Sequence, residues 1–143
     1  LKALGKLYEA EIYQRKAIEL KPDSAEAHYN LGNTLKDLDK LQEAKMSIRK
    51  AIALKPDFAE AYNNLGNTLK DLDKLHEAKI STHKAIELKP DFVEAHLTLG
   101  EILRQLGQNK DAILCSKKAL EIRPWSIQGL YRLNHTCEIE SSS

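Results

Sequence analysis

The sequence predicts an all-α fold, a solenoid of antiparallel helix pairs with about seven to eight helices, and three observations lead to it. The four prolines are 34 residues apart, at Pro22, Pro56, Pro90 and Pro124. Residues 25–58 and 59–92 are identical at 27 of 34 positions. Leu, Ala, Glu and Lys, which favour helices, dominate the 143 residues, whereas only six Gly and four Pro occur.

Each period of 34 residues contains two amphipathic helical stretches. The first is predicted over residues 25–38, where apolar residues such as Leu31 and Leu35 recur at steps of three and four. The second is predicted over residues 42–54, where Ile48 belongs to the same kind of stripe. Because the link between the two stretches is only about three residues long, the helices of a pair must run antiparallel.

The ends of these helices carry repeated signals. The segment Lys-Pro-Asp ends each second helix, because proline lacks an N–H and restricts the residue before it. Asp57, three residues before Glu60, predicts a capping box at the start of the next helix. The same spacing recurs in two further pairs, Asp23 with Glu26 and Asp91 with Glu94.

Three glycines fall in the middle of the first helices, at Gly32, Gly66 and Gly100. Glycine inside a helix costs about 1 kcal/mol relative to alanine. A costly residue at a repeated site indicates a contact that leaves no room for a side chain. We therefore predict that the two helices of each repeat cross closely at the glycine, with small alanines opposite.

The repeated pattern resembles the tetratricopeptide repeat. The residues that carry the resemblance in the first full period are His28, Leu31, Gly32, Leu35, Ala44, Ile48, Ala51 and Pro56. The large aromatic position of the family is occupied by His28, Tyr62 and His96, and we expect these histidines to pack rather than to bind metal. The resemblance implies a right-handed superhelix in which the first helix of each repeat lines a concave, ligand-binding face.

Aligning the repeats predicts how the chain is organised. Residues 1–24 form a partial repeat, in which the end of a first helix is followed by a second helix over about Tyr8–Leu20. Three full repeats follow, at residues 25–58, 59–92 and 93–126. Residues 127–140 are predicted to form a C-terminal capping helix, or else to begin a further degenerate repeat. Residues 141–143 are predicted to be a disordered tail.

The N-terminal edge of the array has no predicted cap. A terminal repeat of a solenoid needs a polar outer face to remain soluble. We therefore expect either that further repeats precede Leu1 in a longer chain, or that this edge associates with a second copy to form a homo-oligomer.

No pattern in the sequence indicates catalysis, a metal site or a cofactor, so we expect the chain not to be an enzyme. His76-Glu77 begins like the metalloprotease motif H-E-x-x-H, but Ile80 stands where the second histidine is required. Cys115 and Cys137 lie too far apart for a zinc ligand pair. We interpret them as two reduced thiols, which is typical of a cytoplasmic protein.

The charge of the chain bears on which partners it binds. Its 22 basic and 21 acidic residues give a net charge of +1, which provides no field to attract nucleic acid or an anionic membrane. No run of about 18 apolar residues is present to span a bilayer. We therefore expect a protein or peptide ligand, with no nucleic acid and no membrane as partner.

The candidate ligand-binding residues lie on the face of the first helices that the core does not use. They are Tyr29, Asn30, Asn33 and Lys36; Asn63, Asn64, Asn67 and Lys70; and Leu97, Thr98, Glu101 and Arg104. Asparagines at equivalent positions, Asn30 with Asn64 and Asn33 with Asn67, form rows of amides that can donate and accept hydrogen bonds along an extended peptide. This arrangement resembles the asparagine-lined groove of O-GlcNAc transferase; the alternative is that these side chains are simply solvated.

A second binding mode in the family is the carboxylate clamp, which holds the acidic C-terminal tails of heat-shock chaperones. Asn33 and Asn64 match its asparagine positions, but Tyr29, Glu94 and Thr98 stand where the clamp has cations. Three acidic residues at the starts of the first helices would also repel an acidic tail, namely Glu26, Glu60 and Glu94. The sequence therefore argues against chaperone-tail binding.

Three functions are compatible with this pattern. The first is a scaffold that binds an extended peptide or a partner protein in its concave groove. The second is a segment of a larger enzyme, of the glycosyl- or sulfotransferase type, to which the repeats present substrates. The third is a structural array whose main contact is its own copy.

Overall fold

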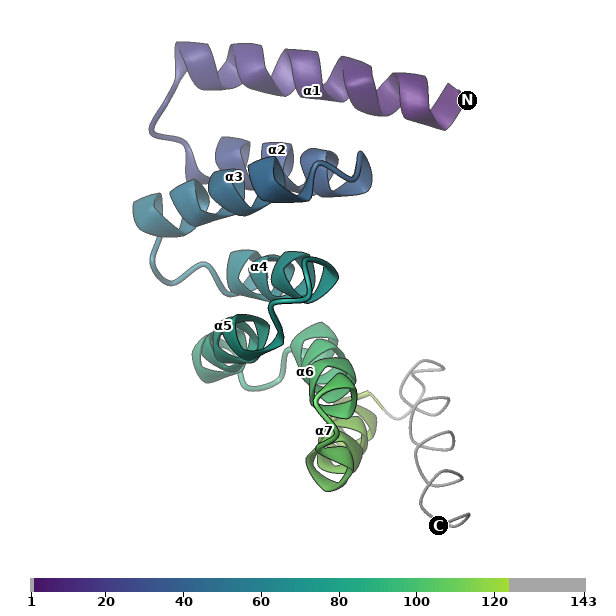
Figure 1. The fold of residues 1–143 in the computed structure, drawn as a ribbon. Coiled ribbons are helices and arrows are strands. Elements are labelled where there is room, and N and C mark those ends of the chain that lie inside the picture. Colours follow the sequence, from purple (N-terminus) through teal and green to yellow (C-terminus); the bar gives the residue numbers. More distant parts are fainter. Residues whose placement is uncertain (1, 124–143) are drawn as a thin grey trace.

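The computed structural model describes residues 2–123, which form seven α-helices and no strand (Figure 1). In chain order they are α1 (Lys2–Leu20), α2 (Ala25–Asp37), α3 (Leu41–Leu54), α4 (Ala59–Asp71), α5 (Leu75–Leu88), α6 (Val93–Gln105) and α7 (Asn109–Ile122). The predicted all-α repeat solenoid is confirmed, and the predicted spans of α2 and α3 agree to within one residue.

The helices stack as a series of pairs. α2 packs on α3, α4 on α5 and α6 on α7, while α3 joins the first pair to α4 and α5 joins the second pair to α6 (Figure 1). The first helices also approach one another, α2 to α4 and α4 to α6, whereas the second helices have no comparable contact among themselves. We call the side formed by α2, α4 and α6 the inner face, and the side formed by α1, α3, α5 and α7 the outer face.

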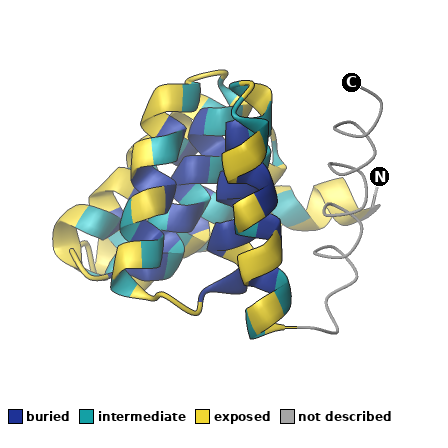
Figure 2. Ribbon diagram, turned by 90° about the horizontal axis from the view of Figure 1, so that it is seen from below, coloured by how far each residue is buried: buried dark blue, intermediate teal, exposed yellow. Residues whose placement is uncertain are grey.

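Buried residues gather where successive helices face each other, with exposed residues on the outward sides (Figure 2). The largest buried cluster joins Ile48 of α3, Leu65 and Leu69 of α4 and Ile102 of α6, with Phe58 just before α4. Each fully buried side chain of this size stabilises the fold by about 1.5–3 kcal/mol. The core thus runs along the array, and each repeat depends on its neighbour to complete it.

The predicted close crossing at the mid-helix glycines is confirmed, but the side chains opposite Gly32, Gly66 and Gly100 are Ile48, Thr82 and Cys115, not the predicted alanines. A Cβ added to Gly32 would lie 2.5 Å from Cγ1 of Ile48 and 3.5 Å from the carbonyl oxygen of Ala44. A Cβ added to Gly66 would overlap Oγ1 of Thr82. The glycines therefore allow α2 to approach α3, and α4 to approach α5, more closely than alanine would permit.

The predicted capping box at Asp57 and Glu60 is wrong. α4 begins at Ala59, so the N-cap residue is Phe58, which makes no side-chain capping hydrogen bond. The ring of Phe58 is buried and lies 4.7 Å from that of Tyr29, centroid to centroid. We attribute the shift to this packing, because burying the ring between repeats fixes Phe58 at the helix start and leaves Asp57 one residue too early.

The two related capping boxes, Asp23 with Glu26 and Asp91 with Glu94, are also wrong, because each helix begins one residue later than the aspartate requires. α6 begins after Phe92, which is buried like Phe58 and makes no side-chain cap. α2 begins after Ser24, which takes the place of the phenylalanine. Its Oγ accepts a hydrogen bond from the backbone N–H of Ala27 at 3.2 Å, so the serine, not Asp23, caps this helix.

The predicted helix boundary near Tyr8 is also wrong, because α1 runs without a break from Lys2 to Leu20. In the three full repeats a turn residue with positive φ separates the two helices: Asp39 at 61°, Asp73 at 61° and Gly107 at 80°. Gly5 holds the equivalent position. The helix continues through Gly5 instead of turning there.

The predicted capping helix at residues 127–140 and the predicted tail at 141–143 lie outside the described residues. The same holds for the last three residues of the repeat predicted at 93–126.

Candidate functional site

A hollow of about 330 Å³ lies between α4 and α6 on the inner face. Its lining comes from two helices: Asn63, Asn64 and Asn67 of α4, with Glu94, Leu97, Thr98 and Glu101 of α6. Steps of three and four residues along each helix place these side chains on one side of it. The structure thus brings together six of the twelve candidate residues, and Glu94 joins them.

Hydrogen bonds tie the amides of α4 to α2. Nδ2 of Asn64 donates to Oδ1 of Asn33 at 2.5 Å and to the hydroxyl of Tyr29 at 3.1 Å. Asn33 and Asn64 are not equivalent positions of the repeat, because the residue equivalent to Asn33 is Asn67. The observed amide contact is therefore offset from the rows expected from the sequence, and it fixes the orientation of three predicted side chains.

Asn63 supplies an acceptor without a partner. The residue is only 5% exposed, and its Oδ1 has no hydrogen-bond partner in the structure. A buried polar atom left in this state costs about 1–3 kcal/mol. The wall of the hollow therefore contains an acceptor that a hydrogen-bond donor would satisfy.

Leu97 and Thr98 are buried, although the sequence places them on the open face. Leu97 packs against Val93 and Ala119, and the hydroxyl of Thr98 donates to the carbonyl oxygen of Glu94 at 2.8 Å. These two residues shape the wall of the hollow. The sequence pattern could not separate them from exposed positions, because their equivalents in the earlier repeats are polar or aromatic.

Two ion pairs lie at the rim of the inner face, one between successive repeats and one within the last repeat. Lys70 pairs with Glu101 at 3.1 Å, and Arg123 pairs with Glu94 at 3.1 Å. The Arg123–Glu94 pair is exposed and contributes about 0–1 kcal/mol, whereas the side chains of Lys70 and Glu101 are more buried. The rim is therefore mixed in charge, with two carboxylates directly beside the amides.

The remaining predicted residues, Asn30, Lys36 and Arg104, do not line this hollow. Asn30 is exposed, and the other two are partly exposed. They lie on the same helices as the network described above, Asn30 and Lys36 on α2 and Arg104 on α6.

Of the histidines at the aromatic position, His96 is buried and His28 is partly buried, and each ring contacts the preceding proline turn. A ring nitrogen, Nε2, of His28 lies 2.9 Å from the carbonyl oxygen of Pro22, and Nε2 of His96 lies 2.8 Å from that of Pro90. Each ring therefore ties the start of a first helix to the preceding proline turn.

Residues 2–123 contain no group of three His, Cys, Asp or Glu side chains placed to hold a metal ion. Burial, together with the nearby Asp111, raises the pKa of the Cys115 thiol to about 11. This thiol is therefore protonated at neutral pH and is a poor nucleophile. None of the described helices is long and apolar enough to cross a bilayer.

Comparison with known families and structures agrees with this geometry. The sequence matches profiles described as tetratricopeptide repeat over residues 25–58, over residues 48–80, and over residues 1–24 and 93–124. A search of the curated proteins found no match.

Several solved structures share the fold. A crystal structure of MamA superposes with a TM-score of 0.87 at 25% identity, covering 98% of this chain and 82% of that one. Pseudomonas aeruginosa PilF gives a TM-score of 0.88 at 24% identity, over 96% of this chain and 63% of that one. The first repeat domain of Spaghetti (RPAP3), bound to the HSP90 peptide SRMEEVD, gives 0.80 at 19% identity, over 82% and 94%.

Proposed function

We propose that this chain, which belongs to the tetratricopeptide repeat family, binds an extended peptide segment of a partner protein on its inner face. The repeat fold is that of a protein-interaction scaffold. The observation that carries the proposal is the hollow between α4 and α6, in which Asn63, Asn64 and Asn67 stand together and a buried amide oxygen has no partner.

Amide side chains suit an extended peptide because an amide carries both donors and acceptors, although Nδ2 of Asn64 already donates twice within the chain and leaves only its oxygen for a ligand. An extended backbone presents N–H and C=O groups at regular intervals and does so whatever its sequence. A peptide N–H, or the nitrogen of a basic side chain, would supply the donor that Asn63 lacks. The proposed ligand is therefore recognised through its backbone first, with any sequence preference added at the rim.

The charges of the site favour a ligand without a dense acidic tail. Two of the seven lining residues are carboxylates, Glu94 and Glu101, and each already has a cationic partner. An additional ligand carboxylate beside them would raise the repulsion. We infer that the inner face selects neutral or basic peptide segments over acidic ones.

Titration with the acidic peptide SRMEEVD tests this selectivity. We expect no saturable binding up to high micromolar concentrations, because the lining lacks the cations that an acidic tail requires. Isothermal titration calorimetry at low ionic strength would measure it, since low salt favours charge-driven binding. Saturable micromolar binding of SRMEEVD would overturn the charge argument.

Removing amides from the groove tests the proposal itself. Peptides selected on the wild-type chain from a random library provide ligands, and fluorescence anisotropy measures their dissociation constants. The double variant Asn64→Ala with Asn67→Ala should weaken binding about tenfold or more, since each lost hydrogen bond contributes about 0.5–1.5 kcal/mol.

The matched control changes exposed polar residues outside the groove. Gln42→Ala with His76→Ala removes two polar side chains near the starts of α3 and α5. This variant should bind the selected peptides as the wild type does. Equal affinities for all three proteins would exclude the amide groove as the binding site.

A further inference from the structure

The outer face carries a repeated triplet of acid, aliphatic residue and lysine. The acid stands three residues before the aliphatic residue, and the lysine stands four residues after it. The triplets are Glu9, Ile12 and Lys16 in α1; Glu43, Met46 and Lys50 in α3; Glu77, Ile80 and Lys84 in α5; and Asp111, Leu114 and Lys118 in α7. This spacing places the three side chains of a triplet in a line along one side of their helix.

The aliphatic members of the triplets are exposed to solvent. Their exposed fractions are 56% for Ile12, 69% for Met46, 70% for Ile80 and 61% for Leu114. A single exposed aliphatic residue needs no explanation, because much of any protein surface is apolar. Four at the same position of successive repeats form a stripe across the outer face, and stripes of this kind mark interaction surfaces.

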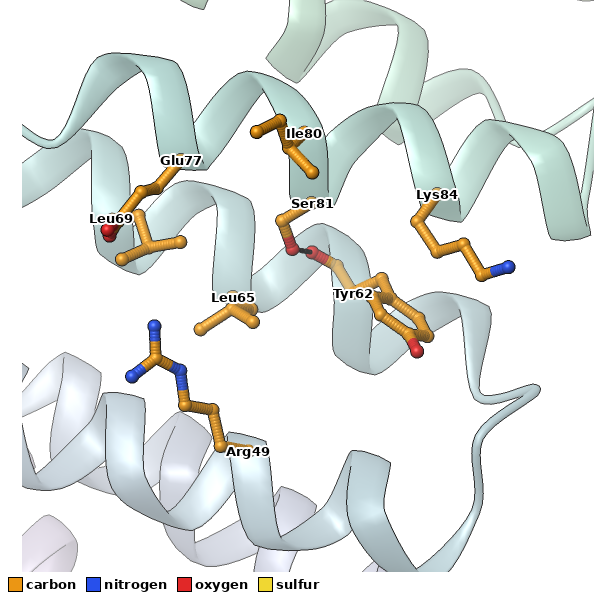
Figure 3. A pocket seen from close by; sticks show the side chains of 8 residues that line it. All are labelled: Arg49, Tyr62, Leu65, Leu69, Glu77, Ile80, Ser81 and Lys84. Carbon is orange, nitrogen blue, oxygen red and sulfur yellow. Dashed lines mark hydrogen bonds between the residues drawn. The ribbon is translucent and has the colours of Figure 1, made fainter.

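The spread of the second helices opens apolar hollows beside the stripe. Figure 3 shows the one between α3 and α5, with a volume of about 440 Å³. Leu65, Leu69 and Tyr62 contribute to its lining, Ile80 stands on α5 beside it, and Arg49 approaches from α3. Similar hollows of about 350 Å³ and 290 Å³ occur one repeat before and one repeat after. The outer face therefore presents aliphatic side chains next to spaces that can receive them.

We propose that the outer face is a pairing surface for a second copy of this chain. In the pair, a two-fold axis runs along the array, so each second helix lies antiparallel to its counterpart in the other copy. The aliphatic stripes then meet at the centre, while the acid of each triplet faces the lysine of the same triplet in the partner. An axis along the helices would instead place acid against acid.

The order of charges along each second helix favours a second copy of this chain over an unrelated partner. A line that reads acid, aliphatic, lysine is complementary to itself when reversed, and all four second helices carry it. Charges of the triplets also meet neighbours within the chain, but these pairs are exposed, at 3.4 Å for Arg15–Glu43, 3.9 Å for Lys84–Glu87 and 3.7 Å for Lys118–Glu121. Pairs of this kind are weak and leave the charges available to a partner.

The stripe extends over more than one helix, as a stable association requires. A stable interface buries about 1,200–2,000 Å² in total, which exceeds what a single helix supplies. The triplets extend over four successive repeat units. Since the outer side of the array is the side on which the helices spread apart, contact is centred on α3 and α5.

Charge reversal tests the pairing with the whole chain. The basic variant Glu43→Lys with Glu77→Lys places lysine opposite lysine in a pair of identical copies. The acidic variant Lys50→Glu with Lys84→Glu places acid opposite acid. Sedimentation analysis over a concentration series should show a wild-type dimer. Each variant alone should have a dimer dissociation constant at least about tenfold higher, because like charges face each other across the interface.

Mixing the two variants tests the charge pairing most directly. In the triplets of α3 and α5, each lysine of the basic variant then faces an acid of the acidic variant. The mixture should therefore form a one-to-one dimer that neither variant forms alone. Asp37→Lys with Asp71→Lys, at exposed ends of first helices, changes the net charge as the basic variant does and should leave the wild-type dimer intact.

Two results would overturn the proposal. One is a wild-type mass equal to a single chain at every concentration. The other is a wild-type dimer that both reversal variants retain, which would place the contact elsewhere. Peptide binding on the inner face is unaffected by either result, so failure here is distinct from failure of the proposed function.

Discussion

At the scale of single residues, the mid-helix glycines differ in how much room they leave. A Cβ on Gly66 would overlap Oγ1 of Thr82, whereas a Cβ on Gly100 would lie 3.3 Å from Cβ of Cys115. Gly66→Ala should therefore lower the free energy of unfolding by about 1–3 kcal/mol. Gly100→Ala should lower it by less, because its Cβ needs only a small shift of Cys115, which the helix propensity of alanine, worth about 1 kcal/mol, can offset. Urea denaturation measures both free energies of unfolding. Equal losses in the two variants would contradict the closer approach of the helices at Gly66.

The amide network shows which residue-level features the sequence could predict. The helical spacing identified the side of α2 and α4 on which Asn33 and Asn64 stand. It could not predict that they bond to each other, because that depends on how successive repeats are offset. Nor could it predict the burial of Asn63, since the next repeat covers it, and no local pattern reports that contact.

At the scale of elements, the carboxylate of Glu11 is one of the groups that tie α1 to the next repeat. Glu11 accepts hydrogen bonds from Nζ of Lys40 at 3.0 Å and from Nε of Arg15 at 2.9 Å. The bond from Lys40, followed by that from Arg15, lowers the pKa of Glu11. A lowered folded pKa means that the stabilisation is present above the ordinary glutamate pKa and is lost as the pH falls through the folded value.

Acidification should therefore loosen α1 before the rest of the array. Nuclear magnetic resonance of α1 amides during a pH titration from 7 to 2 measures this, with Glu11→Gln as comparison. The variant should already show the loosened α1 at neutral pH and should respond less to acid. Identical titrations of the two proteins would show that the carboxylate does not hold α1.

The period of 34 residues predicted every full helix pair, but not how the helices begin. Capping depends on which residue occupies the first position, and there the burial of Phe58 and Phe92 displaced the aspartates. The turn at Asp39 and Asp73 has positive φ, and the glycine at the equivalent Gly107 is the signal that could have revealed it. At Gly5 the same signal was misleading, because α1 continues through that position without a turn.

At the scale of the whole molecule, the array has two faces with different chemistry. The inner face gathers amides and paired charges around the hollow between α4 and α6. The outer face carries the aliphatic stripe and its flanking charges. The two faces are separated by the core, so a peptide on one side and a second copy on the other do not compete for the same residues.

The most direct test of the central claim is to map where a selected peptide contacts the chain. Backbone amide shifts during titration with such a peptide should change most in α4 and α6, around Asn64, Asn67 and Glu101. These changes should be lost in the variant Asn64→Ala with Asn67→Ala. Changes confined to α3 and α5 would contradict the account, because they would place the ligand on the outer face.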